Sequence, residues 1–318
     1  MIPRQSPTLP VALILAACCA FYPALGLPRL ARLAVLAILG SAVVLAPLLI
    51  EPGLSLARLL VAIFAAAEAI KLLDLHLGID RGHRPDLRAF LGFMINPTSV
   101  VQRKLGEGRR PGRGADLGRL GLSLAGAVGG ALLVAMAFRV DWLSRPFAVE
   151  HGSKVISFFL ALIPFFAVVT SSWRLVGGRG RDFMDNPFVA RTPADFWRRY
   201  NRPAQEFFRE DVFKPLGGPR RPLRVALATF LVSALLHEYA FDVGAGRIQG
   251  YQSAFFLIQG VGVVATMRVR PLGWRRYPWI AATLAFNLVT GVLFFASLDE
   301  VVPFYATRPG VAASSLAR

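Results

Sequence analysis

Two polar residues, Asn201 and His237, stand in a chain dominated by apolar runs. His237 lies about fourteen residues into the apolar segment 223–241, which places it about 20 Å from the start of that segment if the segment is helical. A neutral imidazole can accept a proton, and ionisable groups at such depth mark proton relays, ion paths or reacting groups. The alternative is a histidine that is only hydrogen-bonded between helices. Ser233, one turn earlier on the same face, is expected to orient the ring.

The segment before this span predicts an amphipathic helix in the membrane interface. Thr192 can cap its start, Pro193 suits the first turn, and Asp195 complements the positive end of the helix dipole. Apolar residues then recur at spacings of three, four and one, whereas the arginines lie largely on the other side. We expect one helix with a kink at Pro203.

Asn201 belongs to this predicted helix, one turn after Trp197 and close to the border of the apolar face. An amide both donates and accepts hydrogen bonds. The position therefore suits two roles equally well: a structural link to a neighbouring span, or a polar contact with a substrate.

Composition and hydropathy determine the elements that must position these residues. The chain has 318 residues, of which 55% are hydrophobic, and its mean hydropathy is +0.52. Runs of about twenty apolar residues are long enough to cross the bilayer as helices. The sequence predicts an all-α polytopic membrane protein, a single domain over residues 1–318 with about eight transmembrane helices plus interfacial amphipathic helices. The expected spans are 8–27, 30–50, 54–75, 119–138, 153–173, 223–241, 252–268 and 277–297.

The net charge of +17 would suggest a nucleic-acid partner in a soluble chain. In a membrane protein, Lys and Arg gather in cytoplasmic loops and beside anionic lipid, so we expect no nucleic-acid partner. The basic loops, about 76–118 and 174–222, are expected to be cytoplasmic and both termini to lie on the opposite side. The tract from Gly106 to Gly114 has the composition of a linker.

The third span carries charged residues whose roles the sequence leaves open. Glu68 and Lys71 are three residues apart and share a helix face, which favours an ion pair inside the bundle. With Asp74 and His237 they could instead form the polar path of a small transporter. The apolar patch 90–95 is too short to span and predicts an interfacial or re-entrant helix.

Residues that could bind a metal ion are sparse. Cys18 and Cys19, the only cysteines, adjoin within the first span. Glu238 follows His237, but the residue four positions after His237 is Phe241, so the zinc-protease motif is absent. The remaining histidines are expected in loops: His76, His83 and His151. We therefore expect neither a metal site nor a bound cofactor.

Three ordered motifs carry a resemblance to a known family. They are Asn186-Pro187-Phe188, the run from Asp195 to Asn201 (DFWRRYN), and the run from Phe230 to Glu238 (FLVSALLHE). Together they resemble the membrane-bound O-acyltransferase superfamily, in particular its wax-synthase-like branch. Arg198 and Tyr200 depart from the pattern of plant wax synthases, which usually have Gly and Trp there.

The resemblance implies transfer of an acyl group from acyl-CoA to the hydroxyl of a lipophilic alcohol that enters from the bilayer. In that family the histidine inside the membrane is catalytic and the asparagine of the preceding motif supports it, which implies His237 as general base and Asn201 as a partner of the thioester or its oxyanion. Other residues expected at the substrates are Trp197, Ser233, Glu238, Arg198, Arg199, Arg202, Lys214, Arg220 and Arg221.

The basic members of this set could bind the phosphates of CoA, although the preference for cytoplasmic arginines predicts the same residues. Two other classes of protein stay open at this point. One is the small transporter, and the other is a non-catalytic relative that binds lipid.

Overall fold

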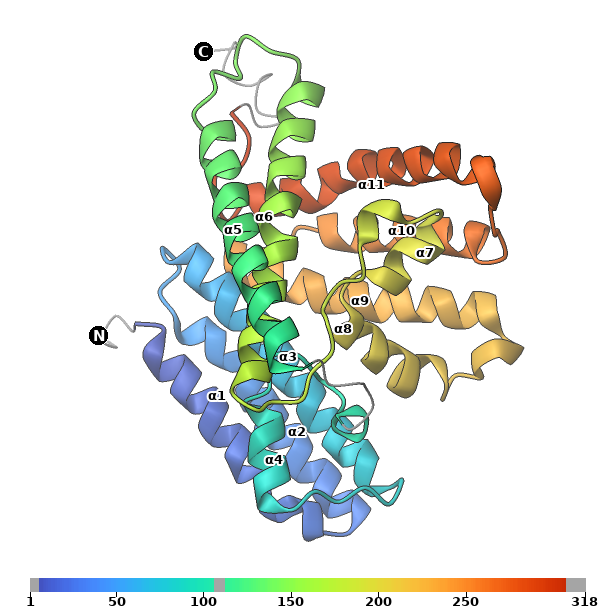
Figure 1. Ribbon diagram of the computed structural model, residues 1–318. Coiled ribbons are helices and arrows are strands. Elements are labelled where there is room, and N and C mark those ends of the chain that lie inside the picture. The colour runs from blue at the N-terminus through green and yellow to red at the C-terminus, as the bar shows by residue number, and fades with distance from the viewer. Residues whose placement is uncertain (1–5, 106–111, 307–318) are drawn as a thin grey trace.

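The computed structural model describes residues 6–105 and 112–306, and within these ranges the chain forms helices joined by short connections, with no β-strand (Figure 1). Six of the described segments are long and apolar enough to cross a membrane. Together with the remaining apolar helices, they confirm the prediction of an all-α polytopic membrane protein. The six contain α1 (Thr8–Ala20) with η1 (Pro23–Gly26), α2 (Arg29–Leu45) with η2 (Ala46–Leu49), α5 (Arg113–Ala137), α6 (Phe147–Leu175), α9 (Pro222–Ala245), and η7 (Gly273–Arg275) with α11 (Arg276–Asp299).

The other two expected spans correspond to α3 (Ser55–Ile79) and α10 (Tyr251–Thr266). The first is interrupted by charged residues and the second has only 16 residues, so neither meets the same length and composition test. α3 also continues past the expected end at residue 75, so the loop that was expected from residue 76 begins later. Most of the predicted linker from Gly106 to Gly114 lies outside the described residues, and Arg113 already belongs to α5.

Two charged residues of α3 pair with each other inside the bundle. Lys71 Nζ lies 2.7 Å from Glu68 Oε1 and also donates to the Met94 carbonyl oxygen at 2.7 Å. Both charged side chains are buried, and the expected ion pair is confirmed. Met94 ends α4 (Leu87–Met94), the short helix expected around residues 90–95, so the same lysine holds α4 against α3.

The site-bearing helix α9 packs between α3 and α10 (Figure 1). On one side, Ala240 and Phe241 of α9 join a cluster with Leu59 of α3. On the other side the backbone of α10 approaches α9 closely, because a Cβ added at Gly260 would stand 2.9 Å from the Phe230 Cβ. α10 in turn contacts α11, and Figure 1 shows these three helices stacked in order, with the α5–α6 hairpin running across them.

The segment before α9 is not the single kinked helix that the sequence predicted. It forms α7 (Pro193–Arg199), then α8 (Arg202–Phe207), and then the π-turn η5 (Phe208–Phe213). The break falls at Tyr200–Asn201, before the expected kink at Pro203. A proline ring clashes with the carbonyl four residues earlier in a continuous helix, so α7 ends at Arg199 and the chain restarts. Short 3-10 turns complete the chain: η3 (Gln102–Lys104), η4 (Pro187–Val189) and η6 (Gly218–Arg220).

Candidate active site

The start of α7 is fixed by side chains, as the sequence predicted. The Asp195 backbone N–H donates to the Thr192 hydroxyl oxygen at 3.1 Å, which confirms Thr192 as the helix cap. The Asp195 carboxylate accepts the Arg191 backbone N–H and the guanidinium of Arg198. Burial alone raises the pKa of Asp195, but these hydrogen bonds and the charge of Arg199 outweigh it and hold the pKa below its usual value. Asp195 therefore stays ionised and holds the first turn in place.

Backbone hydrogen bonds join the segment just before the first motif to the end of the second. The Asp185 N–H donates to the Arg199 carbonyl at 2.8 Å, and the Arg202 N–H donates to the Phe183 carbonyl at 2.8 Å. Asn186 and Asn201 begin the helical turns that follow each segment, and both adopt left-handed backbone conformations, with φ of 42° and 47°. Asparagine tolerates this region better than most residues. The two asparagines thus allow the chain to reverse where the two motifs meet.

The Asn201 side-chain amide forms a hydrogen bond through its oxygen but not through its nitrogen within the described residues. Its Oδ1 accepts the Ala204 N–H at 3.4 Å and caps α8. Within the described residues its Nδ2 forms no hydrogen bond to protein, so it can donate to another group. The structural role that the sequence left open is therefore observed, and the substrate contact stays a prediction.

Trp197 attaches α7 to the membrane helices. Its indole Nε1 donates to Gln259 Oε1 at 2.9 Å, and its ring centroid lies 5.4 Å from that of Phe230 and 5.6 Å from that of Phe256. Phe256 also contacts His237, with ring centroids 4.2 Å apart. Trp197 and Phe256 thus connect α7 to His237, and no hydrogen bond joins Asn201 to His237 in the described part of the chain.

His237 is held by one ring nitrogen. Its Nδ1 lies 2.8 Å from the Ser233 carbonyl oxygen. A carbonyl only accepts, so Nδ1 carries the proton, and the neutral ring presents a lone pair at Nε2. Within the described residues, Nε2 has no hydrogen-bond partner, and the side chain is only partly buried. Ser233 thus orients the ring through its backbone, and the arrangement leaves Nε2 able to accept a proton.

Glu238 binds backbone rather than facing the imidazole. Its two carboxylate oxygens accept the N–H groups of Gly250 and Ser253, each at 2.6 Å, at the beginning of α10. A carboxylate at a helix N-terminus satisfies unpaired N–H groups and complements the dipole. These contacts link α9 to α10 directly beside His237. The predicted contact of Glu238 with substrate stays a prediction.

Gln259 is a polar residue that the sequence reasoning missed. Its side chain is almost fully buried. Its Oε1 accepts from Trp197, and its Nε2 donates to Thr290 Oγ1 at 2.8 Å and to Asn287 Oδ1 at 3.3 Å. A glutamine inside an apolar run was the available signal, since buried amides in membrane helices bridge neighbouring helices. This bridge connects α7, α10 and α11 around the aromatic wall of the site.

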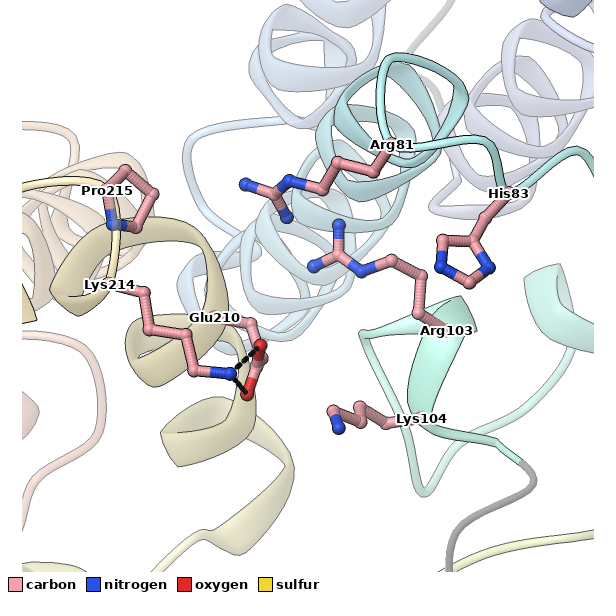
Figure 2. A pocket seen from close by; sticks show the side chains of 7 residues that line it. All are labelled: Arg81, His83, Arg103, Lys104, Glu210, Lys214 and Pro215. Atoms are coloured by element: carbon pink, nitrogen blue, oxygen red, sulfur yellow. Dashed lines mark hydrogen bonds and ion pairs between the residues drawn. The ribbon is translucent and has the colours of Figure 1, made fainter.

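The predicted basic residues separate into three groups. Arg198 and Arg199 both bind the Asp195 carboxylate. Three others, within the described ranges, form no ion pair: Arg202, Arg220 and Arg221. Lys214 alone lines a cavity of about 610 Å³, together with residues that the sequence did not single out (Figure 2). The full lining is Arg81, His83, Arg103, Lys104, Glu210, Lys214 and Pro215.

The expectation that three histidines lie in loops is wrong for two of them. His76 belongs to α3 and His151 to α6, and both are buried, whereas His83 lies in the connection after α3. The charged residues at the start of α6 favoured a loop in the sequence. In the structure they pair with each other, with Lys154 Nζ 2.6 Å from Glu150 Oε1. Internal pairing lets polar residues belong to a buried helix end.

Comparisons with known proteins support the motif reading. The model of the MBOAT, membrane-bound O-acyltransferase, family matches residues 142–295. This region contains α6 to α10 and most of α11, and therefore both Asn201 and His237. No curated protein matches the chain. The family match, over the region where these motifs meet, supports membership of the chain in the membrane-bound O-acyltransferase superfamily.

Proposed function

We propose that the protein transfers an acyl group from a CoA thioester to the hydroxyl of a lipophilic alcohol, as a wax-synthase-like enzyme. The family implies membrane-bound O-acyltransferase activity and lipid substrates, and the donor and acceptor are the proposed refinement. One observation supports the mechanism above others. The hydrogen bond from His237 Nδ1 to the Ser233 carbonyl leaves the Nε2 lone pair for the reaction.

In the proposed step, His237 Nε2 removes the hydroxyl proton as the alcohol oxygen attacks the thioester carbonyl carbon. The new C–O bond forms a tetrahedral oxyanion, whose collapse breaks the C–S bond. The thiolate then takes the proton back from the imidazolium, so the products are an ester and free CoA. Because the thioester already has a good leaving group, no acyl-enzyme is required.

Asn201 is proposed to stabilise the oxyanion. Its Nδ2 has no protein partner within the described residues, whereas its Oδ1 caps α8. A donor with a fixed position contributes more to a developing negative charge than to the neutral carbonyl, which accelerates the chemical step. The backbone hydrogen bonds on both sides of Asn201 provide that fixed position.

The alternative of a polar transport path finds less support. It needs Glu68, Lys71 and Asp74 as exchangeable groups, but Glu68 and Lys71 bind each other and Asp74 contacts Arg103 at 3.2 Å. The proposed topology keeps the loop that carries Asn201 on the cytoplasmic side, where soluble CoA is available.

The test follows release of free CoA by purified protein in nanodiscs, with palmitoyl-CoA or acetyl-CoA and a panel of long-chain, sterol and terpenoid alcohols. The expected result is release that depends on an alcohol and yields the matching ester by mass spectrometry. His237→Gln should remove this release while the variant keeps its elution volume and unfolding temperature. Acceptor-dependent release that persists in His237→Gln would refute the mechanism.

A further inference from the structure

The cavity at the end of α3 is built mainly from cationic side chains. Arg81 and His83 follow α3, while Arg103 and Lys104 come from η3. Lys214 faces them from the segment after η5, and Figure 2 shows the two sides converging on the space between them. The cavity is separate from the residues that surround His237, and none of the three motifs contributes to its lining.

Arg103 is the residue that most strongly indicates a ligand here. Its side chain is only 7% exposed, and its Nη2 lies 2.8 Å from Asp211 Oδ1 and 3.2 Å from Asp74 Oδ1. Its Nη1 is buried and has no hydrogen-bond partner. A buried donor of a charged group destabilises the fold when it has no hydrogen-bond partner. A ligand that accepts a hydrogen bond from it would remove this destabilisation.

The acidic residues of the cavity orient the cations. Arg81 Nη1 lies 2.6 Å from the same Asp211 oxygen that Arg103 contacts, so one carboxylate holds two guanidinium groups side by side. Lys214 binds both oxygens of Glu210. Burial raises the pKa of Glu210, but the hydrogen bond and charge of Lys214 outweigh burial and hold the pKa below its usual value, so the pair stays ionised.

The charge count favours an anion. Arg81, Arg103 and Lys214 each contact a carboxylate, and the lining itself holds four cationic side chains against one carboxylate, that of Glu210. Adjacent guanidinium groups present forks of N–H donors that match phosphate oxygens. A carboxylate or a sugar would use fewer of these donors, whereas a phosphate accepts several at once, and Arg81, Arg103 and Lys214 all line the cavity.

We propose that this cavity is a phosphate-binding site, with Arg103 as its central donor. Two sources can supply the phosphate. One is the nucleotide end of the acyl donor, and this form rests on the proposed function. The other is the headgroup of an anionic phospholipid, which needs no acyl transfer at all.

The test measures binding without turnover. Wild-type protein in phosphatidylcholine nanodiscs is titrated with CoA and with pantetheine, which lacks the phosphates. In parallel, the unfolding temperature is compared between nanodiscs of phosphatidylcholine alone and nanodiscs that also contain phosphatidic acid, because a ligand that binds the folded state stabilises it. The variants are Arg103→Gln and Lys214→Gln, with Arg88→Gln, an exposed arginine outside the cavity, as the matched control.

If the donor is the source, CoA binds and pantetheine binds much more weakly. Arg103→Gln then weakens CoA binding roughly tenfold or more, because a charge-assisted hydrogen bond is lost, while Arg88→Gln does not. If a lipid headgroup is the source, CoA binding is absent and the stabilisation by phosphatidic acid decreases in both cavity variants. Lys214 is half-exposed, so Lys214→Gln keeps the test valid even if Arg103→Gln fails to fold.

Two results would overturn the proposal: neither phosphate-bearing ligand binds the wild type, or both bind the cavity variants as well as they bind Arg88→Gln. The outcome is independent of the catalytic test. Variant-sensitive CoA or lipid binding in a protein that releases no CoA with any alcohol would retain the phosphate site and remove the proposed function.

Discussion

Two histidines in helices of this protein differ in how their ring nitrogens are used. In His151, Nδ1 lies 2.6 Å from the Tyr305 hydroxyl and Nε2 lies 2.8 Å from the Leu288 carbonyl. In His237, Nδ1 is bonded to the Ser233 carbonyl, and Nε2 has no partner within the described residues. Both rings contact phenylalanines, but only His151 is almost fully buried.

The difference separates a structural histidine from one able to react. With Nε2 donating to a carbonyl, His151 must accept the Tyr305 proton at Nδ1, so neither nitrogen is available to a substrate. The ring instead connects α6, α11 and the C-terminal segment, where Lys154 also binds the Phe304 carbonyl at 2.5 Å. Burial of a histidine is therefore a weaker indicator of catalysis than an unused nitrogen.

The largest expected difference is in turnover. His237→Gln should lower acyl transfer by about 10²- to 10⁴-fold, the usual contribution of a positioned general base, with little change in unfolding temperature. His151→Gln should instead lower the unfolding temperature and leave turnover per folded molecule close to wild type. CoA release and thermal unfolding are measured on the same preparations. Equal losses of turnover in the two folded variants would remove the distinction between the two histidines.

Substitutions of Asn201 test whether catalysis needs this amide in addition to the free Nε2 of His237. Glycine and alanine both remove the amide, but glycine accepts the φ of 47° without strain, whereas alanine adds about 1–2 kcal/mol. If Asn201 stabilises the oxyanion, both variants should lose about 10²- to 10³-fold in kcat. Asn201→Gly should nevertheless unfold at a higher temperature than Asn201→Ala. Wild-type turnover in Asn201→Gly would leave the residue only its capping and turn roles.

Tyr305→Phe removes the hydroxyl that satisfies His151 Nδ1 and nothing else. A buried acceptor left without its donor should lower the free energy of unfolding by about 1–3 kcal/mol. Tyr277→Phe, at an exposed tyrosine of α11, is the matched control and should change stability little. Unfolding is followed by temperature or denaturant in detergent. An unchanged stability would mean that the His151 contacts do not hold the C-terminal segment.

Local patterns predicted a large part of this fold. Apolar runs predicted the membrane helices, and Thr192 and Asp195 predicted the start of α7. The three-residue spacing predicted the Glu68–Lys71 ion pair. Each of these depends on residues close together in the chain. Helical periodicity and capping chemistry are local properties, so the sequence reports them directly.

The missed features depend on distant residues or on competition between rules. Arg103 meets Asp211, 108 positions away, and His151 meets Tyr305, 154 positions away, so no local pattern identifies either contact. At Asn201 the apolar periodicity favoured a continuous helix, but the clash at Pro203 and the tolerance of asparagine for positive φ prevailed.

Ser233→Ala gives the smallest expected effect and the finest test of the comparison. Sequence spacing placed Ser233 beside the imidazole, and a hydroxyl at that position would be an obvious partner. The structure instead uses the Ser233 carbonyl, which alanine retains, so Nδ1 keeps its acceptor and Nε2 keeps its lone pair. Turnover should stay within about threefold of wild type, a barrier change below about 1 kcal/mol. A loss close to that of His237→Gln, in a folded variant, would show that the hydroxyl itself orients the ring or binds substrate, and the tautomer assigned from the carbonyl contact would have to be abandoned.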